Sequence, residues 1–190
     1  MLSSDLLAGT FQAAVPYRAH VDSGTPVHRD NWGAALGRVH LTDGQRALIA
    51  GFTRRMNVLC LSGTWCGDCV AQCPMLLRIQ EANPAAVELR FVDRDEHMDL
   101  SERVKICGGL RVPTAIFMNE EFEFVSILGD RTLARYRALA ARKLGPSCPL
   151  PGAPVPAEEL AATVQDWVDE FERVHLLLRL SPKLRQKHGD

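Results

Sequence analysis

Apolar and polar residues alternate along the chain in blocks that predict a core of strands and helices. Short stretches rich in aliphatic, β-branched or aromatic residues predict strands, at 57–62, 87–92, 114–118 and 123–127. Helices are expected between and after these strands, at 66–82, 98–106 and 131–144. The last two strands are separated by the polar residues 119–121 alone, and so short a connection predicts an antiparallel hairpin.

This order of elements predicts the fold class. Strand, helix, strand, helix, strand, strand and helix follow one another over residues 56–144, which indicates an α/β domain whose mixed central sheet is covered by helices on both faces. Residues 1–55 are expected to form a helical N-terminal extension packed on the core. Helices are predicted at 3–14 and 42–54, while Pro16 to Val39, rich in Gly, Pro, His and Asp, is expected to be largely irregular, with at most a short helix near its tryptophan.

The residues after the domain divide into three parts. Five prolines mark 145–156 as a linker. Residues 157–180 predict a C-terminal helix with a strong apolar stripe, which we expect to pack on the domain or on a partner protomer; the second case would give a homodimer. The tail at 181–190 is polar and is expected to be disordered.

Composition narrows the class of protein. Hydrophobic residues make up 46% of the 190 residues and charged residues 24%, which is ordinary for a globular domain. A net charge of −1 gives no electrostatic basis for binding nucleic acid. The sequence shows neither a secretory signal nor an apolar run of the roughly 18–20 residues that a membrane helix needs. We therefore expect a cytoplasmic protein without membrane contact.

The six cysteines suggest the chemistry. They stand at 60, 66, 69, 73, 107 and 148, and three of them fall within eight positions. In a reducing compartment such a cluster is more often catalytic or metal-binding than structural. Two hypotheses follow, a redox dithiol at Cys66 and Cys69, or a zinc site that adds Cys73.

The pair Cys66 and Cys69 has the spacing of a dithiol that can close into a disulfide. Two intervening residues across a loop-to-helix junction bring the sulfurs close without backbone movement. Backbone N–H groups at the helix start are expected to lower the pKa of Cys66 from about 8.5 towards about 7. Cys66 is thus the predicted nucleophile, and Cys69, one turn further on, the predicted resolving thiol.

Residues around the dithiol resemble the thioredoxin family. Trp65 precedes the pair, a proline lies five residues after Cys69, Val112-Pro113-Thr114 opens a strand, and a glycine at 129 follows the hairpin. The resemblance covers about residues 56–144. It implies a thioredoxin-like fold, a cis peptide bond before Pro113 that faces the dithiol, and a substrate-binding role for Trp65, Val112 and Pro113. An extended substrate segment would pair with the Val112 backbone.

The sequence departs from the family pattern at two positions. Asp68 stands where most thioredoxins have proline; it either takes the proton from Cys69 or is a solvated residue that tunes nothing. Cys60 stands where the family usually has a buried aspartate, and a thiol is a poor base at neutral pH, so it is expected to fill the core. Cys73 could act as a second resolving thiol, complete a metal site, or be inert.

The function predicted from these residues is thiol–disulfide oxidoreduction. Cys66 and Cys69, with Trp65 and Asp68 beside them, would reduce disulfides in protein or small-molecule substrates. No cofactor or metal is expected, and electrons would come from a reductase or another dithiol. A partner-binding module without catalysis is the alternative, followed by the cysteine-ligated zinc module.

Overall fold

The computed structural model of the chain describes residues 2–144 and 158–190, and its centre is a four-stranded mixed sheet. The spatial order is β2-β1-β3-β4, with β1 parallel to β2 and antiparallel to β3, which pairs in turn with β4. The predicted strands and the hairpin are confirmed within two residues at each end; their bounds are β1 Met56–Ser62, β2 Val87–Asp93, β3 Thr114–Met118 and β4 Phe124–Gly129.

Strand β1 forms the middle of the core. All seven of its residues are buried, because it is covered on both faces and paired on both edges. The pairing register places the end of β1 beside the start of β3, with Leu61 opposite Thr114. On the other edge Ser62 lies opposite Asp93, the last residue of β2. The loops that follow β1 and β2 and the loop that precedes β3 therefore meet at one end of the sheet.

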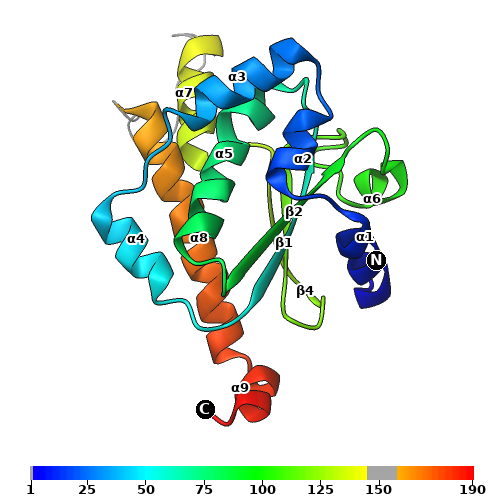
Figure 1. The fold of residues 1–190 in the computed structure, drawn as a ribbon, viewed down its shortest axis with the longest axis vertical. Coiled ribbons are helices and arrows are strands. Elements are labelled where there is room, and N and C mark those ends of the chain that lie inside the picture. Colours follow the sequence, from blue (N-terminus) through cyan, green and yellow to red (C-terminus); the bar gives the residue numbers. More distant parts are fainter. Residues whose placement is uncertain (1, 145–157) are drawn as a thin grey trace.

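Helices cover both faces of the sheet, as predicted (Figure 1). Helices α5 (Gly67–Ala82) and α8 (Glu159–Leu180) lie on one face, and α1 (Ser4–Ala13) and α6 (Met98–Arg103) lie on the other. Helix α7 (Leu133–Lys143) follows β4 and packs on α8. No helix among residues 2–144 and 158–190 is long and apolar enough to cross a membrane.

The N-terminal extension is more regular than the sequence suggested. The segment expected to be largely irregular forms helices α2 (Tyr17–Asp22) and α3 (Pro26–Leu36), and α4 spans Asp43–Ala50. That prediction was wrong because the prolines mark helix starts: Pro16 is the N-cap of α2, and Pro26 occupies the first turn of α3, where no N–H is required.

The extension also reaches the sheet itself. Val15 forms an isolated antiparallel bridge to Phe91 of β2, with N···O distances of 3.0 and 2.7 Å. Large side chains of α1 to α3, among them Phe11 and Trp32, are buried in the same core as the strands. The extension is thus packed on the core, and its second helix contacts β2 directly.

The apolar stripe of α8 packs against its own chain. Trp167, Val168, Phe171 and Val174 are fully buried, and the rings of Phe171 and Phe117 meet edge to face at 5.1 Å. A homodimer through this helix would have to use its opposite side, so it stays a prediction. The proline-rich linker lies outside the described residues.

The polar tail, expected to be disordered, contains helix α9 (Pro182–His188), so that prediction was wrong. Leu184 of this helix is buried. Three of its four basic side chains pair with the acidic turn between β3 and β4, in contacts that join Lys183, Lys187 and His188 to Glu120, Glu121 and Glu123. Cations that look solvated in the sequence are therefore neutralised by a turn about sixty residues away.

Two adjacent leucines of α8 test how much this helix contributes to stability. Leu178 is 2% exposed and Leu177 is 43% exposed. We expect Leu178→Ala to lower the free energy of unfolding by about 2–5 kcal/mol, because it removes buried methyl groups and leaves a cavity. Leu177→Ala should change it by no more than about 0.5 kcal/mol. Urea unfolding followed by circular dichroism compares the two, and equal effects would show that α8 is not part of the cooperative core.

Candidate active site

The dithiol lies where the loop after β1 turns into α5. Cys66 is the N-cap of α5, as predicted, and is partly exposed, whereas Cys69 is 0% exposed. Neither is bonded to another cysteine. Trp65 is 46% exposed beside them, and the guanidinium of Arg94 lies 4.5 Å from the centre of its ring. Cys66 thus lies at the surface of the protein, and Cys69 lies in its interior.

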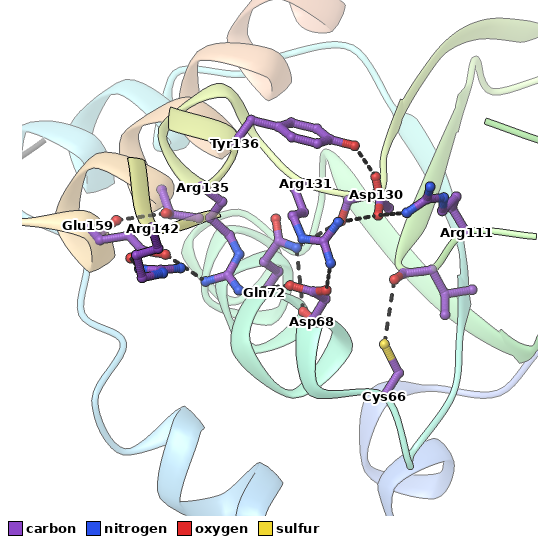
Figure 2. A network of polar contacts seen from close by, with 12 residues as sticks. Cys66, Asp68, Gln72, Arg111, Asp130, Arg131, Arg135, Tyr136, Arg142 and Glu159 are labelled. Atoms are coloured by element: carbon purple, nitrogen blue, oxygen red, sulfur yellow. Dashed lines mark hydrogen bonds and ion pairs between the residues drawn. The ribbon is translucent and has the colours of Figure 1, made fainter. Parts of the chain in front are cut away.

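The start of β3 supplies the other wall of the site. The Val112–Pro113 peptide bond is cis, which confirms the expectation from the family resemblance. The Cys66 thiol donates a hydrogen bond to the carbonyl oxygen of Val112 at 3.5 Å (Figure 2). The antiparallel pairing of β1 with β3 produces this approach, because Val112 and Pro113 immediately precede β3, which begins beside Leu61.

Glycine at 129 is needed for the backbone to pass close to Pro113. A Cβ atom at this position would lie 2.8 Å from the carbonyl oxygen of Pro113 and 2.7 Å from Oγ1 of Thr114. Real Cβ atoms essentially never come so close to their neighbours. Gly129 thus allows the close packing that fixes the turn at cis-Pro113, as its place in the family pattern suggested.

Each thiol of the dithiol affects the pKa of the other. The neighbouring Cys69 thiol, and after it burial, raises the pKa of Cys66, while hydrogen bonds from the backbone of Cys69 and Asp68 act to lower it. Burial also raises the pKa of Cys69 well above its ordinary value. The helix terminus therefore provides the predicted stabilisation, but in the reduced pair it is outweighed, contrary to the expected drop in the pKa of Cys66.

Asp68 points away from the dithiol into a cluster of arginines (Figure 2). Its carboxylate forms ion pairs with Arg131 and with Arg135, the latter at 2.8 Å, and all three side chains are about one-fifth exposed. Arg131 also pairs with the buried Asp130 at 2.8 Å. Asp68 therefore ties the first turn of α5 to the start of α7. This arrangement fits neither a solvated residue nor a base aimed at Cys69.

The remaining cysteines differ in their surroundings. Cys60 and Cys73 are fully buried, with their sulfurs 4.0 Å apart, so Cys60 fills the core as expected. Cys107 is exposed at a positive φ of 50°, and Cys148 lies outside the described residues. Within residues 2–144 and 158–190, no three His, Cys, Asp or Glu side chains are grouped so as to hold a metal ion. This disfavours the zinc hypothesis built on Cys66, Cys69 and Cys73.

Sequence reasoning missed the contribution of the N-terminal extension. The indole N–H of Trp32 donates to the carbonyl oxygen of Thr64 at 2.9 Å, and Nδ1 of His28 lies 3.2 Å from the Thr64 hydroxyl. Helix α3 therefore holds the loop that leads into the dithiol. The only signal in the sequence was an isolated tryptophan among polar residues. When a tryptophan side chain is buried, its N–H usually finds a hydrogen-bond partner.

Comparisons with known proteins agree with this fold. A family model described as thioredoxin matches residues 15–140. A protein of unknown function from Pseudomonas aeruginosa is similar in structure, with a TM-score of 0.61 at 20% identity, over 92% of this chain and 93% of that one. A crystallised HIV epitope-scaffold gives a TM-score of 0.62 at 18% identity, over 88% and 92% of the two chains. Comparison with curated proteins finds no significant match.

The chain belongs to the thioredoxin family, since the matched segment covers well over half of its residues. The match begins at residue 15, with the bridge that Val15 forms to the sheet, rather than at the expected domain start of 56. The two similar structures extend over nearly the whole chain, so the extension and the C-terminal helix belong to a fold that other proteins share.

The close packing at Gly129 gives a test of the site. Gly129→Ala should lower the free energy of unfolding by about 1–3 kcal/mol, because the new Cβ has to push Thr114 or the Pro113 backbone aside. Gly33→Ala is the matched control: its Cβ meets nothing within 4 Å on a helix, so it should be neutral or stabilise by up to about 1 kcal/mol. Thermal unfolding of both variants measures these changes in stability. A Gly129→Ala protein as stable as the parent would contradict this account.

Proposed function

We propose that the chain is a thiol–disulfide oxidoreductase that reduces disulfides in proteins or small molecules through Cys66 and Cys69. The observation that carries the proposal is the pairing of a partly exposed Cys66, at a helix N-terminus and 3.5 Å from the Val112 carbonyl, with a fully buried Cys69 in the next turn. One sulfur can be reached by a substrate, and the other can be reached only through the first.

The chemistry follows thiol–disulfide exchange. The Cys66 thiolate attacks one sulfur of the substrate disulfide, forms a mixed disulfide and releases the first substrate thiolate. Cys69 then attacks Cys66, which releases the second substrate thiolate and leaves the Cys66–Cys69 disulfide. Two electrons pass from the dithiol to the substrate, and a reductase or another dithiol returns them. The two sulfurs suffice for this cycle without a bound cofactor.

Substrate binding is proposed at the surface around Cys66. The half-exposed Trp65 offers an apolar contact next to the reactive sulfur. The Val112 backbone before cis-Pro113 faces that sulfur, in the position where an extended substrate segment would add as a strand. A cytoplasmic location, expected from the sequence, fits this direction of electron flow, because reducing compartments keep such dithiols reduced.

Insulin reduction with dithiothreitol as the electron source tests the proposal. The unmodified chain should accelerate insulin precipitation above dithiothreitol alone, and Cys66→Ser should abolish the acceleration because the attacking sulfur is lost. Cys69→Ser should stop turnover and retain insulin in a mixed disulfide that nonreducing electrophoresis detects. Cys107→Ser, at an exposed cysteine that is not part of the dithiol, is the control and should keep full activity. A chain that binds substrate without accelerating the reaction would instead be the partner-binding module.

A further inference from the structure

The resolving step requires a base that the usual family position does not provide. Cys69 must lose its proton before it attacks Cys66, yet its side chain is fully buried. Cys60, at the position of the family's buried aspartate, is itself a thiol. Asp68 is committed to Arg131 and Arg135. None of these groups can accept the proton readily, so another polar group near Cys69 has to be considered.

Ser62 is such a group, placed at the end of β1 on the same face as Cys60. It is 0% exposed, and its Oγ lies 3.8 Å from the sulfur of Cys73 on the facing helix α5. Ser62 also acts on Cys69, which lies one turn before Cys73 on α5: burial is the main influence and raises the pKa of Cys69, whereas Ser62 acts to lower it. The Ser62 hydroxyl therefore faces the side of α5 that carries Cys69 and Cys73, and it favours the thiolate of Cys69.

The same hydroxyl contacts a buried histidine of the N-terminal extension. Nε2 of His20 on α2 lies 3.1 Å from Oγ of Ser62. His20 is 3% exposed; its ring stacks on Phe91 at 5.3 Å and meets Trp32 edge to face at 5.6 Å. Burying a polar side chain this deeply is costly, and the ring of His20 directs its hydrogen bond to Ser62, on the dithiol side of the sheet.

The surroundings of His20 favour an uncharged imidazole that can accept a proton. Burial lowers its pKa, so the ring is uncharged at neutral pH, while Asp93 at the end of β2 acts in the opposite direction and stabilises the imidazolium once it forms. The Cys73 thiol on α5 lies 3.8 Å from the Ser62 oxygen. Tyr17, on the same helix as His20, contacts the Trp32 and Phe91 rings.

We propose that His20, acting through Ser62, accepts the proton of Cys69 during resolution of the mixed disulfide. This inference rests on the proposed oxidoreductase function and adds to it a proton acceptor supplied by the N-terminal extension. The Cys69 thiol gives its proton to the Ser62 oxygen as Ser62 gives its own proton to Nε2 of His20. The Cys69 sulfur then bonds to the Cys66 sulfur, and the bond between Cys66 and the substrate breaks.

The protons and electrons balance over this step. The departing substrate thiolate carries away the electron pair of the broken S–S bond and takes a proton from water. The imidazolium of His20 returns its proton to solvent before the next cycle. In the reverse reaction, when a donor dithiol reduces the Cys66–Cys69 disulfide, the protonated relay would supply the proton to the Cys69 thiolate as it leaves.

Stopped-flow reaction of the reduced chain with one equivalent of 5,5′-dithiobis(2-nitrobenzoate) separates the two steps. The first release of thionitrobenzoate reports attack by Cys66, and the second reports attack by Cys69 on the mixed disulfide. At pH 7, His20→Gln and Ser62→Ala should each slow the second release about 10²-fold and leave the first unchanged. The second rate should rise about tenfold per pH unit in the variants, since each then depends on free thiolate, but should level off above the pKa of His20 in the parent chain.

Matched variants separate this role from a structural one. His40→Gln removes an exposed histidine of the same N-terminal extension and should leave both rates and their pH profiles unchanged. Cys73→Ala tests whether Ser62 serves Cys73 instead, and should also leave the second release intact. His20→Phe keeps an aromatic ring against Phe91 and should behave like His20→Gln if packing is not the cause.

Two results would overturn the inference. One is a second release in His20→Gln and Ser62→Ala that keeps the parent rate and pH profile. The other is a loss of that release in Cys73→Ala. If either occurs while the parent chain still reduces insulin, the relay is wrong and the proposed function stands. If the parent chain reduces no insulin yet the two releases respond as expected, the relay holds and the assignment as a disulfide reductase fails.

Discussion

The antiparallel pairing of β1 with β3 is the constraint on which the rest of the site depends. Because Leu61 lies opposite Thr114, the chain that leaves β1 and the chain that enters β3 are neighbours at one end of the sheet. The first carries Cys66 and the second carries the cis peptide before Pro113. A shift of this register by one residue would turn every side chain of β1 to the opposite face and separate the sulfur from the Val112 carbonyl.

Three separate parts of the chain hold the dithiol in this position. The Asp68 carboxylate ties the first turn of α5 to Arg131 and Arg135 in and beside α7. The Trp32 indole fixes the loop before Cys66 from the side of the N-terminal extension. The close packing at Gly129 fixes the proline turn from β4. The dithiol, with Cys66 partly exposed and Cys69 buried, is thus held by segments far apart in the sequence.

The sequence predicted the sheet, the hairpin and the helix on which the dithiol lies, because apolar periodicity and short motifs are local signals; the cis peptide was implied by the resemblance to the thioredoxin family. It failed where structure depends on distant partners. The basic residues of α9 look like a disordered tail until the acidic turn at 119–123 is placed beside them. Asp68 reads as a possible base until Arg131 and Arg135 arrive from another helix. The importance of His20 depends on the fold, since nothing in its local sequence points to Ser62.

The hydrogen bond from Trp32 to Thr64 also bears on what counts as the working unit of this protein. An excised core that began at residue 56 would keep every cysteine, the cis-proline turn and all four strands. It would lack the Trp32 indole that donates to the Thr64 carbonyl. It would also lose Tyr17 and His20, whose rings contact Phe91 of β2. Such a fragment would contain the whole dithiol motif, but the loop before Cys66 would lack its support. The side chains of α2 and α3 that support the loop before the dithiol are therefore part of this fold.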